Sequence, residues 1–359
     1  MELAEYPDYD YVPCAEREEE VRHNKAQLGD PWNYDLLSGI TYLTGTLDVQ
    51  SDSTGDKDFT KLTGLRCIDG DMRIWYTDEL ESLHGLESLI RIGGNLDIEA
   101  NKALSDISAL SGITGTKGKV DLYGCPLMES LEGLHNIEKA QTISIETMNA
   151  LKDLNGIRGL QSVGTLVIYT ATQLNTLAGL ENVNKIGCVL QIVNTNISSL
   201  QGLSGLESMG TDCEDAVIIL GNNHNLSSLE GMDNLETITG TFQLISNSIL
   251  ADTRGLEKIT GINGDIIIDN NDSLKALTGL ENLKTITESI RITGNLNLMD
   301  ITALYNLESF GSDLGRDLVI INNPKLPTCQ CEHLRSLLMA KGWNGFYDFT
   351  GTDGTASCE

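Results

Sequence analysis

Apolar and polar residues repeat along the chain with a period of about 24 residues, and this period predicts the architecture. The first apolar strand position of each repeat lies 23 to 28 residues before the next one. A fixed period of this length is typical of a solenoid, in which each repeat buries its apolar face against its neighbours. Twelve starts predict about twelve turns. These starts are Leu47, Met72, Leu96, Val120, Ile143, Leu166, Leu190, Val217, Phe242, Ile266, Ile290 and Leu318.

Within one repeat, the spacing of the apolar residues predicts strands and corners rather than a helix. Ile266 and Ile268 alternate with polar or outward positions, as in a strand. From Leu274 to Ile286 the apolar residues then follow in strict steps of three. An α-helix would rotate such a stripe by about 60° at each step, so a single buried face could not form. Glycines such as Gly279 recur at the corners, where a positive φ is often needed.

At these positions the chain resembles the receptor L domain family, found in the ectodomains of epidermal growth factor and insulin receptors. The segment Asn234–Gly261, NLETITGTFQLISNSILADTRGLEKITG, follows that family's pattern of a Leu/Ile run, Ile-x-Gly and a short strand. The resemblance covers residues 40–328 and implies an all-β, right-handed parallel β-solenoid. It also implies a protein ligand outside the cell, contacted by the broad sheet face. Leucine-rich repeats are the competing fold, but the Ile-x-Gly strand start favours the L domain.

The unbroken period predicts one continuous domain with a cap at each end. Residues 1–39 form the predicted N-terminal cap, residues 40–328 the continuous L-domain-like solenoid, and residues 329–359 the C-terminal cap. In the last of these, an amphipathic stretch with Leu334 and Leu337 on one face predicts a short helix. Terminal repeats of a solenoid need such covers because their last turn has no neighbour.

Charge and hydropathy exclude several classes of partner. The chain has 52 acidic and 24 basic residues and a net charge of −28, which disfavours nucleic acid and anionic lipid. Solubility explains such a charge, and a cationic partner is the alternative. No run of 18 apolar residues is present, so the sequence predicts no membrane span. The acidic start indicates either a cytosolic chain or a mature chain whose leader has been removed. Eight cysteines favour the second and an extracellular or cell-surface location.

The cysteines can be placed by their position in the repeat. Cys188 and Cys213 precede neighbouring strands, so we expect a bridge that holds the long seventh turn. Cys125 occupies a position where other repeats have asparagine, and we expect a free, buried thiol. A bridge from Cys14 in the cap to Cys67 at the end of the first turn is a further candidate.

The C-terminal cysteines leave the pairing open. Cys329 begins the predicted helix, and either Cys358 or Cys331 would close the tail. Cys329, Cys331 and His333 could suggest a metal, but a zinc site needs four ligands and no second pair is present.

The sequence predicts no cofactor and no metal. The loop that carries Asp52, Asp56 and Asp58 is rich in oxygen ligands for Ca²⁺, but a solvated insertion is the preferred interpretation.

Some outward strand positions carry carboxylates, which raises an enzyme as an alternative. Asp97, Asp121 and Glu146 lie on successive outward positions, and a glycoside hydrolase needs two carboxylates at a suitable separation. We expect no basic residue or histidine beside them, which weakens this reading. A carbohydrate-active β-helix therefore stays the alternative to a binding protein, and a structural spacer is the third.

Other outward positions carry aromatic and aliphatic residues, although a wet sheet face is normally polar. An exterior apolar patch marks an interface or a covering element. We therefore predict a non-enzymatic recognition or adhesion protein that binds a protein partner, or alternatively a glycan, through this face. In this interpretation Val217 and Ile219 point into the core. The predicted face consists of Trp75, Tyr123, Tyr169, Val193, Ile218, Leu220, Ile245 and Ile267.

Overall fold

The computed structural model describes residues 25–28, 38–50, 59–311 and 316–358. These residues fall into two compact units, unit 1 up to Val183 and unit 2 from Asn184. Each unit is a parallel β-solenoid, which confirms the predicted fold class. The single continuous solenoid over residues 40–328 stays a prediction. The N-terminal cap lies almost wholly outside the described residues, as do Cys14 and the loop with Asp52, Asp56 and Asp58.

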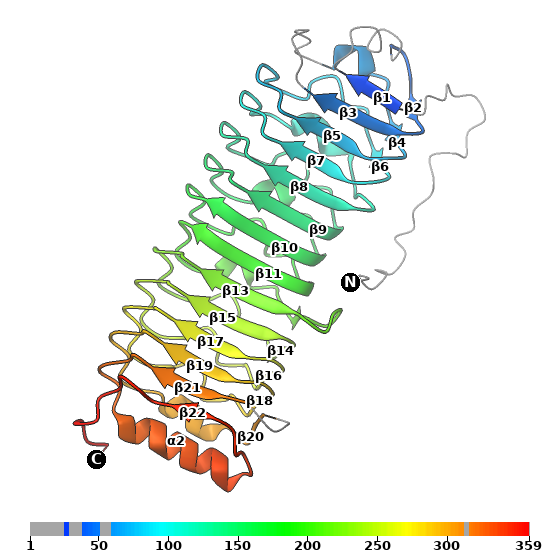
Figure 1. Ribbon diagram of the computed structural model, residues 1–359. Helices are drawn as coiled ribbons and strands as arrows, with labels where there is room; N and C mark the ends of the chain where they lie inside the picture. Colours follow the sequence, from blue (N-terminus) through cyan, green and yellow to red (C-terminus); the bar gives the residue numbers. More distant parts are fainter. Residues whose placement is uncertain (1–24, 29–37, 51–58, 312–315, 359) are drawn as a thin grey trace. The chain divides into compact units, whose positions relative to one another are not determined.

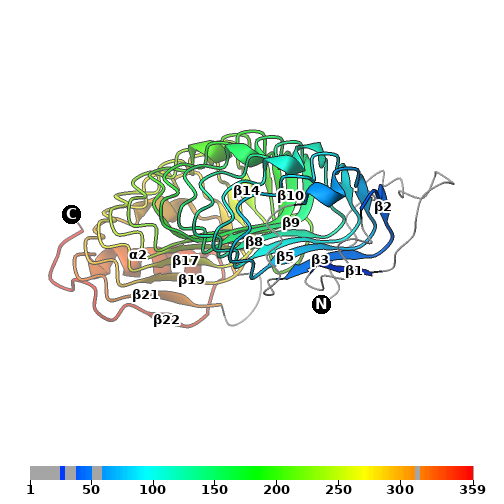
Figure 2. The same cartoon turned by 90° about the horizontal axis from the view of Figure 1, so that it is seen from above.

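Unit 1 has a long parallel sheet on one side and short 3₁₀ turns on the opposite side (Figures 1 and 2). Its neighbouring strands are joined in parallel register. The strands are β1 (Lys25–Leu28), β3 (Thr46–Gln50), β5 (Met72–Trp75), β7 (Leu96–Glu99), β8 (Lys119–Tyr123), β9 (Lys139–Glu146) and β10 (Ser162–Ala171). A second, three-stranded sheet contains β2 (Tyr42–Leu43), β4 (Cys67–Ile68) and β6 (Arg91–Ile92). The 3₁₀ turns are η2 (Thr60–Leu62), η3 (Ser108–Gly112) and η4 (Asn155–Ile157).

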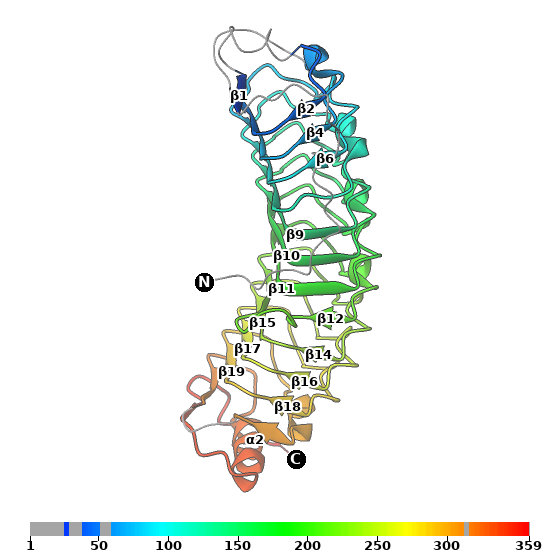
Figure 3. The ribbon, with the colours of Figure 1, turned by 90° about the vertical axis from the view of Figure 1, so that its right-hand side faces the viewer.

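Unit 2 repeats this plan, with two rows of strands on adjoining sides of the coil (Figure 3). The long row is β11 (Lys185–Thr195), β13 (Val217–Gly221), β15 (Thr241–Ile245), β17 (Ile266–Asp269), β19 (Ile290–Thr293), β21 (Leu318–Ile321) and β22 (Tyr347–Asp348). The short row is β12 (Ser208–Met209), β14 (Thr237–Ile238), β16 (Gly261–Ile262), β18 (Thr285–Ile286) and β20 (Ser309–Phe310). Its helical elements are η5 (Gln201–Leu203), η6 (Thr302–Asn306) and α2 (Thr328–Ala340).

The core of each unit follows the predicted spacing. In the turn that starts at β17, both inward strand residues and the five residues at steps of three are at most 1% exposed. They bury their apolar surface against the turns above and below, because one turn alone has too little interior. These residues are Ile266, Ile268, Leu274, Leu277, Leu280, Leu283 and Ile286.

The predicted register of the eighth turn is wrong by one residue. Ile218 pairs with Leu190, and both Ile218 and Leu220 are fully buried. Val217 and Ile219 point outward and are half-buried. Residues 216–220 read Ala-Val-Ile-Ile-Leu and do not alternate, so the sequence does not specify which face is inward. A shift of one residue exchanges the two faces of a strand.

The asparagines after the strands have two distinct roles at consecutive positions. Asn222 and Asn270 adopt positive φ, of 53° and 57°, which asparagine tolerates better than most residues. The next residue points inward and joins a buried ladder. Asn247, for example, accepts from the backbone N–H of Asn223 at 3.1 Å and donates to the carbonyl of Leu220 at 2.9 Å. The ladder of unit 2 consists of Thr195, Asn223, Asn247, Asn271, Asn295 and Asn323.

One corner of the turn needs glycine and an acid two residues later. Gly279 has φ +111°, and a Cβ there would lie 2.4 Å from the carbonyl oxygen of Thr253 in the turn before. Its N–H donates to the Glu281 carboxylate at 2.7 Å. The same bond recurs from Gly179 to Glu181 at 2.8 Å. Part of the acidic surplus therefore satisfies backbone N–H groups at corners.

The C-terminal cap is the predicted helix, α2. Cys331, Leu334 and Leu338 are its buried residues, whereas Leu337 is only half-buried. Cys329 is bonded to Cys358, and Cys331 is a free, buried thiol whose pKa burial raises to about 12. Among the described residues, no helix is both long and apolar enough to cross a bilayer.

The other cysteines occupy the environments that their repeat positions suggest. Cys188 is bonded to Cys213, with 5.6 Å between their Cα atoms. Cys125 is free and buried beside Asn101 of the neighbouring turn, and burial raises the pKa of its thiol. Cys67 is disulfide-bonded.

Removing the Cys188–Cys213 bridge is expected to lower the free energy of unfolding by about 2–4 kcal/mol, because the bridge restricts a long loop of the unfolded chain. Denaturant unfolding of Cys188→Ser/Cys213→Ser against the wild type measures this difference. In the same experiment an alkylating reagent should label Cys125 and Cys331 only after unfolding. Labelling of Cys125 in the folded protein, or equal stability of the two proteins, would contradict these assignments.

Candidate functional site

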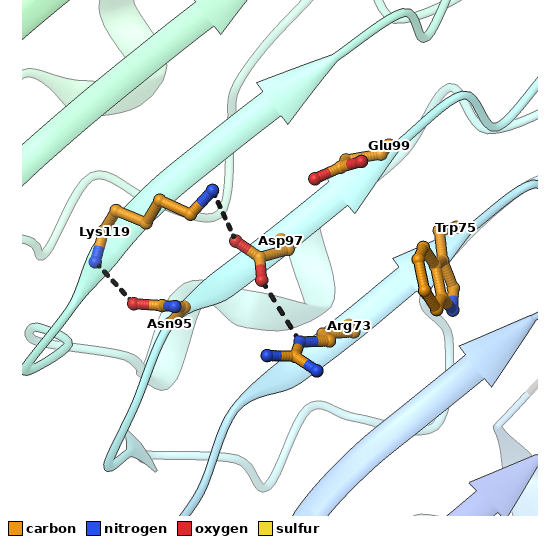
Figure 4. A pocket seen from close by; sticks show the side chains of 6 residues that line it. All are labelled: Arg73, Trp75, Asn95, Asp97, Glu99 and Lys119. Carbon is orange, nitrogen blue, oxygen red and sulfur yellow. Dashed lines mark hydrogen bonds and ion pairs between the residues drawn. The ribbon is translucent and has the colours of Figure 1, made fainter.

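A pocket lies on the outward face of the long sheet of unit 1 (Figure 4). Its volume is about 280 Å³. Strand side chains alternate between the two faces of a sheet, so every second residue of these strands points out to the pocket. The lining residues come from β5, β7 and β8 and from the residue before β7. They are Arg73, Trp75, Asn95, Asp97, Glu99 and Lys119.

Two basic residues hold the carboxylates of this pocket, and the expectation that none would stand beside them is wrong. Lys119 Nζ lies 2.6 Å from Asp121 Oδ2 and 3.5 Å from Asp97 Oδ1. Arg73 Nε lies 3.4 Å from Asp97 Oδ2, and Arg73 pairs with Asp97 in the sheet register. Arg73 occupies the same outward position as Asp97 one turn earlier and was readable from the sequence, whereas Lys119 occupies the strand position before the first inward residue.

Glu99 is the carboxylate of the pocket that no cation holds. It makes no hydrogen bond or ion pair with any described residue, whereas Asp97 and Asp121 do. Burial raises the pKa of Glu99, and repulsion from Asp121 and Asp97 raises it further, although attraction to Lys119 and Arg73 partly opposes this. Burial also raises the pKa of Asp97, although Lys119 and Arg73 partly oppose this. The fold therefore disfavours the ionised form of both groups.

These groups could hold a cation, but they are poorly arranged for hydrolysis. One oxygen each of Asp97, Glu99 and Asp121 lies within 4.8 Å of the others, and the Lys119 ammonium is already ion-paired with two of them, Asp97 and Asp121. Asp97 is only 8% exposed and is ion-paired, so it presents no free carboxyl to a substrate. Glu146 accepts a hydrogen bond from Ser144 at 2.7 Å and lies on the next strand, β9. The carbohydrate-active enzyme gains no support from this geometry.

Beside the cluster runs a row that we call the aromatic–carboxylate row: Trp75, Glu99, Tyr123, Glu146 and Tyr169. Each residue is the register partner of the next one on five neighbouring strands. Tyr123 is 45% exposed and Tyr169 is 42% exposed. Trp75 is half-buried, and its indole N–H donates to Asp48 at 2.8 Å. The structure thus brings the three predicted aromatic residues into one line, with a carboxylate in each gap.

The alternation within this row was visible in the sequence but was missed. The outward residues three positions after each strand start read Trp, Glu, Tyr, Glu, Tyr over five repeats. Residue type alone shows that acids and aromatics share these turns, and the strand register shows that they alternate along one line.

Two residues of the predicted face in unit 2 lie in the core, and this corrects part of the prediction. Ile245 and Ile267 point outward and are half-buried, and Val193 points outward but is 8% exposed. Ile218 and Leu220 belong to the core and cannot contact a partner. The one-residue shift of β13 puts Val217 and Ile219 on the outward face in their place.

Comparisons with known proteins support the resemblance for part of the chain. Residues 258–342, all in unit 2, match the model of the receptor L domain family. A search of curated proteins found no significant match. Among solved structures, an internalin from Listeria monocytogenes is similar, with 18% sequence identity and a TM-score of 0.44. That similarity covers 89% of this chain and 84% of the internalin chain. The receptor L domain match suggests a role in protein recognition.

Proposed function

We propose that this chain is a non-enzymatic recognition protein that binds a protein partner through the outward sheet face of unit 1. The aromatic–carboxylate row is the observation that carries the proposal. An outward strand position that faces water is normally polar, and the fold gains little from a large ring there. Tyr123 and Tyr169 nevertheless expose over two fifths of their surface, side by side with acids.

The residue types in the row are those that dominate binding energy at protein interfaces. Tyrosine and tryptophan offer a large apolar surface and few rotatable bonds, so little conformational entropy is lost when a partner covers them. Trp75 is already fixed by its hydrogen bond to Asp48, and the parallel register fixes the spacing of all three rings. A rigid surface of this kind needs little reorganisation on binding.

The proposed place of action is outside the cell or at its surface, where adhesion or recognition would use this face. Two disulfides lie in unit 2, and Cys67 of unit 1 is also disulfide-bonded. Disulfides persist mainly in oxidising compartments. The receptor L domain match supports the same location.

Replacing both exposed tyrosines is expected to abolish partner binding without unfolding the protein. Truncation of a tyrosine that acts as a binding hot spot weakens binding by about 2 kcal/mol or more, which is roughly thirtyfold for each residue. Tyr123→Ala/Tyr169→Ala and the wild type are each immobilised, and captured surface proteins are quantified by mass spectrometry. A photo-crosslinking residue at position 123 then identifies which captured proteins touch the row.

Leu127 provides the matched control, because it is an exposed apolar residue of unit 1 that lies in a loop outside the row. Leu127→Ala should retain every partner. If the tyrosine variant also retains every partner, the proposed face is wrong. If no protein is ever crosslinked at position 123 but the wild type degrades a polysaccharide, the enzyme alternative is correct, and Asp121→Asn should then remove that activity.

A further inference from the structure

The aromatic–carboxylate row has a regular spacing that can be compared with the spacing of a ligand. Neighbouring strands lie about 4.8 Å apart, so the rings of Trp75, Tyr123 and Tyr169 recur about every 9.6 Å across the strands. Glu99 and Glu146 occupy the two gaps and are separated by the same distance. The row therefore offers two sites of similar plan, each with one carboxylate between two rings.

The charges in the two gaps differ from those elsewhere on this face. Asp97 and Asp121 form ion pairs with Arg73 and Lys119. No such cation reaches Glu99 or Glu146 among the described residues, and Glu146 accepts only from the Ser144 hydroxyl. Both gaps thus present a carboxylate that has no ion-pair contact among the described residues, and Lys119 and Arg73 attract Glu99 only from a longer distance.

A cationic side chain fits each gap better than a neutral group does. A guanidinium or ammonium group is attracted to the faces of aromatic rings and to a carboxylate at the same time. Guanidinium also stacks on rings and loses little hydration, which favours arginine. A neutral sugar would stack on the rings and donate hydroxyl hydrogen bonds to the carboxylates, but it would bring no positive charge to balance theirs.

The spacing then selects the backbone conformation of the ligand. A polyproline II helix has three residues per turn and rises about 9.3 Å per turn, within about 0.3 Å of the row's period. In an extended strand, side chains on one face recur about every 6.7 Å, which is shorter than the period of the row. In an α-helix, side chains on one face recur after about 5.4 Å or 10.8 Å, and both distances differ from the period of the row by more than the polyproline II spacing does.

We propose that the row binds an arginine-containing segment in polyproline II conformation, with two arginines three residues apart, one above Glu99 and one above Glu146. The inference rests on the proposed function of this face and specifies the partner's chemistry. The segment lies across the strands, parallel to the row. A chain with a net charge of −28 attracts such a segment from a distance as well.

Two labelled peptides of equal composition test the spacing: acetyl-PPRPPRPP-amide and acetyl-PPRPPPRP-amide. In the second, the arginines lie about 12.4 Å apart and are rotated by about 120°, so only one gap can be filled. Fluorescence anisotropy with the full chain, at about 0.1 M ionic strength, measures both affinities. The first peptide should bind about fivefold to tenfold more tightly, the value of one exposed cation–π contact with its ion pair.

Glu99→Gln/Glu146→Gln should remove this preference and weaken the first peptide about tenfold. Because the fold opposes ionisation of Glu99, this variant should be no less stable than the wild type, which thermal unfolding checks. Glu138→Gln is the matched control, since Glu138 is an exposed acid of unit 1 outside the row. It should leave both affinities unchanged.

The outcomes separate this inference from the proposed function. Equal binding of the two peptides, or a preference that survives the double glutamine variant, would overturn the inference. The inference is also overturned if neither peptide binds. If Tyr123→Ala/Tyr169→Ala still loses its protein partner in that experiment, the proposed function stands. If a neutral oligosaccharide binds the row and the glutamine substitutions of Glu99 and Glu146 do not change its affinity, the ligand of the row is a glycan and not a cationic segment. Only if the tyrosine variant keeps every partner do both proposals fail.

Discussion

Leu220→Arg is expected to unfold unit 2, with a loss of more than about 4 kcal/mol in the free energy of unfolding. Leu220 is fully buried on the inward face of β13, where its neighbours are turns of Leu and Ile. An arginine there would lie in a dry interior without a counter-ion, and the stacked turns leave no room for it. Circular dichroism and urea unfolding of the variant measure the effect.

Ile219→Arg is the matched control, because Ile219 is the next residue of the same strand and points outward. An arginine at this position reaches water, so the change in stability should stay within about 0.5 kcal/mol. The pair also tests the register of β13 directly. If Ile219→Arg unfolds the protein and Leu220→Arg does not, the inward face of β13 is the one that the sequence first predicted.

Asn247→Leu is expected to destabilise unit 2 by about 2–5 kcal/mol, although leucine is the more apolar residue. Asn247 is fully buried, and its side chain satisfies the N–H of Asn223 and the carbonyl of Leu220. Leucine would leave the N–H of Asn223 buried and unpaired, at a cost of about 1–3 kcal/mol, and would also remove the amide bond to the Leu220 carbonyl, which contributes about 0.5–1.5 kcal/mol. Urea unfolding at neutral pH provides the comparison.

Asn282→Leu controls for the general effect of replacing an asparagine in unit 2. Asn282 is exposed and makes one bond, to the carbonyl of Glu257 at 2.7 Å, which water can replace. Its loss should therefore cost no more than about 1 kcal/mol. Equal effects of the two substitutions would show that the inward ladder contributes no more than a surface hydrogen bond.

The sequence predicted the fold because its strongest signal is a period, and a period does not depend on the accuracy of any single element. Ile266 and Leu274 are buried as expected, since the residue spacing of a turn defines which side chains share the interior. Register is less well specified. Where a strand alternates, as in β5 with Met72 and Ile74 inward, the prediction is correct. Where a strand does not alternate, as in β13, only its pairing with the neighbouring strands determines which residues point inward.

The candidate site was predicted in part, and the missing part concerns contacts between turns. Trp75, Tyr123 and Tyr169 were found because each is an unusual residue at an outward position. The ion pairs of Lys119 were not found, because they join side chains that lie 22 residues apart or sit at a strand edge. Such contacts depend on the exact stacking of turns. The order of residues across strands carries that information, and it becomes readable once the register is known.

The buried ladder also restricts how the chain can be modified while it is being made. Asn271 begins an Asn-Asp-Ser acceptor sequence for N-linked glycans, yet its side chain is fully enclosed and bonded within the ladder. A glycan attached there to the nascent chain would prevent this turn from closing. The acceptor asparagines at 196 and 225 are exposed and carry no such conflict. In a host that glycosylates secreted proteins, folding of the tenth turn would compete with the enzyme that attaches N-linked glycans, because both require the Asn271 side chain.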